Sequence, residues 1–499
     1  MGLNALDLVI IAIYLAGITI FGLRFRKKQR SLKDYFLADK SIPWWAISLS
    51  IVAAETSTLT IISVPGLAYD KDFGFLQIVI GYLVGRFIIS FLLIPHYFRG
   101  DLFTAYQLIE RRFGQKLRSL TAGLFLITRA AAEGVRVFAV AIVVAIALSS
   151  MLAGFGDFGR DVAAIAIVTL LTLIYTFEGG MAAVIWTDVV QMAIYVTGTV
   201  VGFFTILHGV PGGWSTIQSV AGEAGKFRVF DFSWDFFKTY TFWSGVIGGA
   251  FLTTASHGTD QLIVQRLLAA KSQRQSKLAL LSSGVFVLFQ FGLFLLVGAM
   301  LFVFYKLMPP AEAFTKTDKI FPTFIVTNMP HGISGLLIAA ILAAAMSNLS
   351  AALNSLASTS IIDFYARIRP NSSEDRRVFL SRVATVAWGI ILFVLAILSR
   401  KGGKVVEMGL SIASVAYGAL LGVFLLGVLT KKANERGAMI GMLCGFVLNV
   451  YLWQFTKVPF TWYVALGSIF TFAVGYAASL LFTGTPTRKE IEESDKVHA

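Results

Sequence analysis

The chain has 499 residues, of which 57% are hydrophobic and 14% are charged, and its mean hydropathy is +0.76. A soluble protein carries about 25% charged residues, so this composition excludes an ordinary soluble protein and predicts an all-α membrane protein. The single cysteine, Cys444, excludes a disulfide framework and cysteine metal clusters.

Apolar runs of about 20 residues, each long enough to cross a bilayer, recur along the chain. They predict about thirteen transmembrane helices, near residues 5–23, 43–69, 74–97, 119–152, 161–177, 181–208, 240–261, 278–308, 331–365, 378–399, 405–430, 436–455 and 459–482.

The formal net charge of +14 is explained by the distribution of basic residues between the two sides of the membrane. The basic clusters fall in loops on one side of the predicted membrane: Arg24–Lys33, Arg111–Arg118, Lys271–Lys277, Arg367–Arg382 and Lys431–Arg436. This is the positive-inside bias, and it accounts for the charge without a nucleic-acid partner. It predicts a multi-pass protein of the plasma membrane (the inner membrane in a bacterium), with its N-terminus outside and its C-terminus cytoplasmic.

The first span is expected to be an accessory helix. The second, near 43–69, contains polar residues at mid-depth: Glu55, Thr56, Ser57, Thr58 and Thr60. Their hydroxyls can bond back to the main chain, and Pro65 lacks an N–H and crowds the carbonyl of Ile61. We therefore expect this helix to be broken, with freed carbonyls facing protein, water or an ion.

Charged residues also lie within the third and fourth spans. The third contains Gln77 and Arg86, and the fourth contains Arg129, Glu133 and Arg136 on one helical face. Two readings remain open for the arginines: a structural ion pair, or an Arg136 that meets an anionic or hydroxyl-rich ligand. Asp188, in the sixth span, calls for either a cation or several hydrogen-bond donors.

The outer segment 209–239 is expected to hold a short surface helix. The seventh span is interrupted by polar residues between Thr253 and Asp260. Two interrupted helices five spans apart predict two oppositely oriented five-span halves with the binding site between them. The predicted organisation is an accessory span (1–30), a first repeat (41–208), a second repeat (240–432), two extra spans (433–483) and a cytoplasmic tail (484–499).

In the ninth span, Ala344, Ser347 and Asn348 share one helical face. That face suits either close packing of small residues or cation binding. Carbonyls near Ala53 and Thr56 opposite this face would suit sodium, which as a hard cation prefers oxygen ligands. A proton would instead need a titratable group such as Glu55 or Asp188. Nucleotide-binding and metalloprotease motifs are absent, so we expect no enzyme activity.

Four segments resemble the sodium/solute symporter family: ISVPGLAY (62–69), GGMAAVIWTDVVQ (179–191), TDQLIVQRLLAAKS (259–272) and AAAMSNLSAALNS (343–355). The resemblance covers about residues 5–480. It implies a LeuT-type 5+5 inverted repeat with one extra N-terminal helix and two extra C-terminal helices.

The resemblance also implies site residues. The principal sodium site corresponds to the carbonyls of Ala53, Thr56 and Ala344 with the side chains of Ser347 and Asn348, where relatives usually have Ser or Thr in place of Asn348. A second sodium site corresponds to Asp188, Ser347 and Ser350, with Ala351 replacing a serine. The implied substrate residues are Ser57, Thr58, Thr60, Gln77, Arg136 and His257.

These features predict a sodium-coupled symporter that imports a small polar solute by alternating access and works as a monomer. Arg136 matches an arginine of sialic acid carriers, whereas the run from Thr259 is more like sugar carriers, so sugars, sialic acid or other carboxylates, and amino acids all remain candidates. A proton-coupled symporter of the same fold, a transporter-like membrane sensor and a channel are the alternatives.

Overall fold

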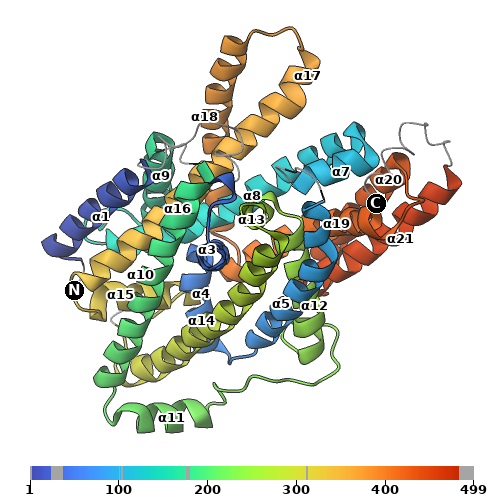
Figure 1. The fold of residues 1–499 in the computed structure, drawn as a ribbon. Coiled ribbons are helices and arrows are strands. Elements are labelled where there is room, and N and C mark those ends of the chain that lie inside the picture. The colour runs from blue at the N-terminus through green and yellow to red at the C-terminus, as the bar shows by residue number, and fades with distance from the viewer. Residues whose placement is uncertain are drawn as a thin grey trace.

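The computed structural model describes residues 3–23, 38–99, 102, 105–175, 180–310 and 313–482. The regular elements of these residues are helical, apart from one isolated bridge between Ile42 and Ala270. The helices are α1 (Ala5–Leu23), α3 (Trp44–Glu55), α4 (Thr58–Asp70), α5 (Leu76–Ile88), α6 (Ile94–Tyr97), α7 (Ala105–Phe113), α8 (Gln115–Ala147), α9 (Asp157–Tyr175), α10 (Gly180–Gly209), α11 (Gly213–Glu223), α12 (Phe242–Gly258), α13 (Gln261–Leu268), α14 (Gln273–Leu307), α15 (Ile320–Asn328), α16 (Ile333–Thr359), α17 (Ala366–Ile368), α18 (Glu374–Ser399), α19 (Val405–Leu429), α20 (Glu435–Phe455) and α21 (Tyr463–Leu481) (Figure 1).

Several of these helices are long and apolar enough to cross a bilayer. Nine qualify within the described residues, or ten if the bent pair α3 and α4 is one span. The other three expected spans correspond to α1, α9 and α12, of which α12 has 17 residues and α9 begins with the charged run 157–161. The chain is thus a multi-pass membrane protein, and the count of about thirteen spans stays a prediction.

The second span is broken, as expected. Helices α3 and α4 meet at an angle of 64°, and the break lies at Thr56 and Ser57. The prediction that Pro65 contributes to the break is wrong, because Pro65 lies inside α4. The hydroxyl-rich sequence itself interrupts the helix: the Thr60 hydroxyl donates to the carbonyl of Glu55 at 3.1 Å, in competition with the helical ladder.

The seventh span is also interrupted. Helix α12 ends at Gly258 and α13 begins at Gln261. Asp260 caps α13 by accepting a hydrogen bond from the Leu262 N–H at 2.9 Å. An Asp at an N-cap satisfies one of the free N–H groups of the new helix. Both predicted interruptions are therefore present, while the two-repeat organisation stays a prediction.

Helix α1 packs along α16 at one edge of the molecule, and α20 and α21 pack with α19 at the opposite edge (Figure 1). The buried Asp7 of α1 accepts hydrogen bonds from the N–H groups of Gly332 (2.6 Å) and Gly335 (3.2 Å), and its carboxylate lies 2.7 Å from Nδ1 of His331. This contact supplies a carboxylate to the N-terminus of α16 from another helix, which stabilises both.

The two ends of the molecule differ. The hairpin of α17 and α18 extends from one end, and the predicted short surface helix, α11, lies at the other (Figure 1). Helix α18 exposes large apolar side chains, including Val383 (48%), Ile390 (60%) and Leu398 (63%). A long helix with an apolar exposed face is stable only against lipid or a partner, so this face is expected to contact the bilayer.

Candidate functional site

The break between α3 and α4 leaves main-chain oxygens without partners. The N–H of Thr56 bonds to the carbonyl of Val52 at 2.7 Å, and the Thr60 hydroxyl bonds to the carbonyl of Glu55. Within the described residues, the carbonyls of Ala53 and Thr56 accept no hydrogen bond from another group. The carbonyl oxygens of Ala53 and Thr56, which the sequence predicts to be sodium ligands, are therefore available to a cation.

A cavity lies beside this break, between α4, α8, α9 and α16. Its polar lining consists of Ser57, Thr58, Glu133, Arg136 and Asn348. Its apolar lining consists of Leu59, Val137, Val140, Val168, Ala345 and Leu349. The cavity volume is about 20 Å³, enough for a water molecule or a bare cation. Binding of a larger solute requires these helices to separate.

Polar side chains around the cavity are available to a ligand. Ser57 and Thr58 are buried, yet neither hydroxyl hydrogen-bonds to another residue in the described parts of the chain. The same holds for the Asn348 amide and the half-buried Ser347 hydroxyl on α16. Polar groups in a protein interior normally have partners, so these side chains have hydrogen-bonding capacity left for an ion, a water or a solute.

Charged side chains of α8 form one wall. A single oxygen of Glu133, Oε1, accepts a hydrogen bond from Arg136 (3.0 Å) and forms an ion pair with Arg129 (2.9 Å). Glu133 is 1% exposed, whereas Arg136 is 32% exposed and lines the cavity. Asp260 lies close enough to Arg129 to attract it. Two arginines and two carboxylates are together neutral. Arg136 still has N–H groups beyond the one that it donates to Glu133, and an anion could accept hydrogen bonds from them.

A second charged cluster holds the end of α3. Arg86 of α5 donates to the carboxylate of Glu55 and to the Ser283 hydroxyl (3.2 Å). His257 of α12 lies 3.4 Å from the same carboxylate oxygen and 2.9 Å from the Ser256 hydroxyl. Arg86 is fully buried. This cluster links the break in α3 and α4 to the end of α12, and it places His257 near the break without making it part of the cavity wall.

The expected substrate residues divide into two groups. Ser57, Thr58 and Arg136 line the cavity. Thr60 and His257 instead bond within the structure, and the fully buried Gln77 donates to the carbonyl of Gly74 (3.1 Å) while accepting from an N–H of the outer segment 224–241. In the described part of the chain, these three do not belong to the cavity lining.

The expected cation residues also differ in their surroundings. Ala344 is buried on α16, on the same face as Ser347 and Asn348, and Ser350 is buried one turn further along. The hydroxyl of Thr56 donates to the side-chain oxygen of Gln290 on α14 at 2.8 Å, which orients the hydroxyl and leaves its lone pairs, like the Thr56 carbonyl, available to an ion.

Asp188 has a partner that sequence reasoning missed. Arg266 of α13 donates to Asp188 at 2.9 Å and to the Ser50 hydroxyl at 2.8 Å. Both members of the ion pair are buried, with Arg266 at 4% and Asp188 at 8% exposure. One indication of such a partner was present in the sequence: a carboxylate inside an apolar span needs a counter-charge. The structure places a fixed cation beside Asp188.

Comparisons with known proteins agree with this geometry. The model of the sodium:solute symporter family matches residues 35–445. The Sodium/sialic acid symporter SiaT of Proteus mirabilis is 30% identical over 94% of both chains, and the Sodium/sialic acid symporter NanT of Aliivibrio fischeri is 29% identical over 98% of this chain and 96% of its own.

A solved structure of a Na⁺-coupled sialic acid symporter, in a substrate-bound outward-open state, superposes with a TM-score of 0.79 at 29% identity. The match covers 96% of this chain and 98% of the other. The second span is broken and lies beside a cavity with unpaired polar groups. The family model matches most of the chain, and the relatives match almost its whole length. The chain therefore belongs to the sodium:solute symporter family.

Proposed function

We propose that the chain is a sodium-coupled symporter that imports a small carboxylate-bearing solute by alternating access. The observation that carries this proposal is the cavity that joins Ser57 and Thr58 of α4 to Arg136 of α8 and Asn348 of α16. A guanidinium with unused donors next to unpaired hydroxyls is suited to an anion that also carries hydroxyl groups. The relatives named as sialic acid symporters support an acidic sugar over a neutral one.

Sodium is proposed to bind where the freed carbonyls of Ala53 and Thr56 meet α16. Ala344 would add a carbonyl, and Ser347 and Asn348 would add side-chain oxygens. These are neutral ligands, so the ion is held without a full counter-charge and can leave in each cycle. A bound ion would hold the break of α3 and α4 against α16 and so complete the solute site.

We infer a stoichiometry of one sodium per solute. The second implied site, at Asp188, Ser347 and Ser350, would depend on the carboxylate for its charge. Arg266 already neutralises that carboxylate. Proton coupling through Glu55 is disfavoured, because its ion pair with Arg86 stabilises the charged form of the carboxylate.

The remaining features follow from this proposal. We propose a 5+5 inverted repeat, function as a monomer without enzyme activity, an external N-terminus and a cytoplasmic C-terminus. Sodium would favour the solute-competent state, the solute would close the outer side, and loss of sodium to the cytoplasm would release the solute inward. The cavity of about 20 Å³ is too small for a sugar, so helix movement is part of each cycle.

Uptake into proteoliposomes tests the proposal. Sialic acids, small monocarboxylates, neutral sugars and amino acids would be compared in sodium and in choline at one pH. We expect a carboxylate to be taken up electrogenically in sodium alone. Equal uptake in choline would disprove sodium coupling, and uptake of neutral sugars alone would disprove the role of Arg136.

A pair of serine variants tests the sodium site. Ser347→Ala should raise the sodium concentration for half-maximal uptake, with less effect on solute affinity at saturating sodium. Ser358→Ala, on the exposed side of the same helix, is the control, because among the described residues the Ser358 hydroxyl bonds only to the carbonyl of Ser355 (3.1 Å). Identical sodium dependence in both variants would remove Ser347 from the site.

A further inference from the structure

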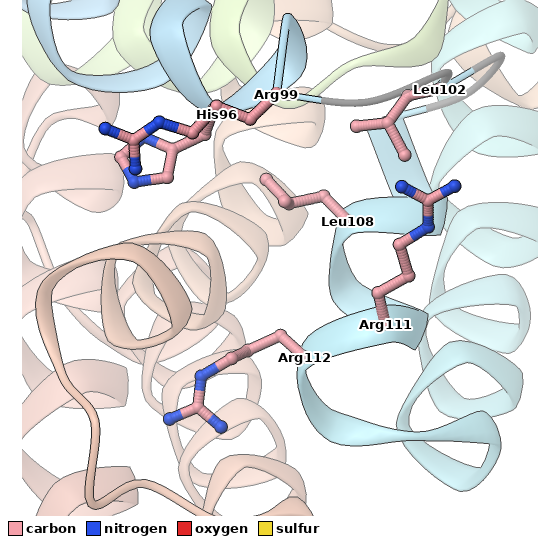
Figure 2. Close-up of a pocket in the computed structure, with 6 residues that line it drawn as sticks. All are labelled: His96, Arg99, Leu102, Leu108, Arg111 and Arg112. Atoms are coloured by element: carbon pink, nitrogen blue, oxygen red, sulfur yellow. The ribbon is translucent and has the colours of Figure 1, made fainter. Parts of the chain in front are cut away.

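We propose that a basic pocket between α6 and α7 binds the phosphate of an anionic phospholipid headgroup. The pocket is separate from the transport cavity and shares no lining residue with it. It is lined by His96, Arg99, Leu102, Leu108, Arg111 and Arg112, and its volume is about 20 Å³ (Figure 2). Four of these six side chains are basic, and none of the described lining residues is a carboxylate.

The basic groups surround the pocket from two segments. Figure 2 shows His96 and Arg99 on one side, Leu102 and Arg111 on the other, Arg112 below them and Leu108 in the middle. Arginine side chains are long and bind phosphate oxygens in pairs. The two leucines, both buried, form the apolar floor of the pocket.

Arg112 is the residue that most needs an anion. It is half-buried, and its Nε is buried without a hydrogen-bond partner. Its guanidinium donates a hydrogen bond to the Thr430 carbonyl at 3.0 Å and lies over the Phe113 ring, 4.9 Å from the ring centroid, but no carboxylate in the described part of the chain pairs with it. Burial lowers the pKa of Arg112. Leaving a half-buried guanidinium unpaired is unfavourable, and a bound phosphate would relieve this.

The position of the pocket favours a lipid over a dissolved anion. The span formed by α5, a π-helical turn (Ile89–Leu93) and α6 ends at Tyr97, immediately before the pocket. Helix α7 buries Leu108, Ile109 and Phe113, so it lies against the bundle at the level where the span leaves the hydrocarbon. Basic pockets between helices at this depth bind acidic headgroups.

The test is lipid binding by the full chain in detergent. Thermal stability and native mass spectrometry would be measured with phosphatidylglycerol, phosphatidylcholine and inorganic phosphate. We expect phosphatidylglycerol to stabilise the wild type and to remain bound, and the other two to have no effect. The double variant Arg99→Gln/Arg112→Gln should weaken phosphatidylglycerol binding by about tenfold or more.

A matched control separates this pocket from general surface attraction. The double variant Arg369→Gln/Arg376→Gln removes two exposed arginines from the hairpin of α17 and α18, on the same side of the membrane. It should bind phosphatidylglycerol like the wild type. If the pocket variant does not fold, Arg99→Gln alone, at an exposed position, should still weaken binding relative to Arg369→Gln.

Three outcomes would overturn the proposal. Unchanged lipid binding in the pocket variants would remove the site. Equal losses in the control would leave only non-specific attraction to basic surface. Stabilisation of the wild type by inorganic phosphate without lipid would assign the pocket to a soluble anion instead.

Discussion

Replacing Arg266 by Met should convert the ion pair at Asp188 into an additional sodium site. Met is shorter than Arg, but it is unbranched and flexible and fills irregular apolar gaps, so the change removes the charge and keeps much of the packing of the Arg stem. The carboxylate of Asp188 would then be buried, with the Ser50 hydroxyl as its remaining described partner. A sodium ion could neutralise it, in competition with a proton.

The size of the effect follows from the burial of the pair. The side chains of Arg266 and Asp188 are 4% and 11% exposed. Removing one member of a buried ion pair costs about 3–5 kcal/mol, and we expect the lower value because the unfolded state in a membrane keeps some polar contacts. Sodium at about 100 times its dissociation constant would restore about 2.7 kcal/mol.

Thermal unfolding of the purified protein in sodium and in choline measures this. The variant should be less stable than the wild type in choline and should gain more stability from sodium. Its sodium dependence of uptake should also become steeper. The double variant Asp188→Asn/Arg266→Met is the control, since without the carboxylate the extra sodium stabilisation should disappear.

The reasoning is refuted if Arg266→Met is as stable as the wild type in choline. It is also refuted if sodium stabilises the single and double variants equally, because the lost charge would then have no connection with cation binding.

Three further predictions concern single side chains. Arg136→Gln should weaken inhibition of uptake by carboxylate solutes by about tenfold or more and leave neutral analogues unaffected; a similar loss for both would contradict direct binding. Gly298→Ala should destabilise the protein by about 1–3 kcal/mol, because its Cβ would lie 2.1 Å from a carbonyl oxygen of α4, whereas Gly292→Ala has no atom within 4 Å and should melt like the wild type. Asp7→Asn should cost about 1–2 kcal/mol and raise the sodium requirement, because it weakens the cap at Gly332 on α16; normal melting and normal sodium dependence would show that the cap is unimportant.

Local composition was sufficient to predict the membrane class and the break in the second span. A carboxylate and several hydroxyls between residues 55 and 60 interrupt a helix wherever it lies, because they compete with its own backbone. Helical periodicity likewise placed Ala344, Ser347 and Asn348 on one face. The expectation that Pro65 helps to break the helix was wrong, because Pro65 lies inside α4 and packs next to Gly298 of α14.

Pairing between distant segments was decided by the tertiary structure. Asp188 and Arg266 are separated by 78 residues, and Glu55 and Arg86 by 31. Each charge could be recognised in the sequence as one that needs a partner, but the identity of that partner depends on how the helices pack.

The sequence by itself determined that this is a membrane protein with a polar, broken helix, because burial of main-chain and charged groups in lipid is limited by local chemistry. Only the tertiary structure decided which polar groups remain unpaired. Gln77, Thr60 and His257 found partners within the protein, whereas Ser57, Thr58 and Asn348 were left facing a cavity. That division arises because hydrogen bonds form between whichever groups the packed helices bring within reach.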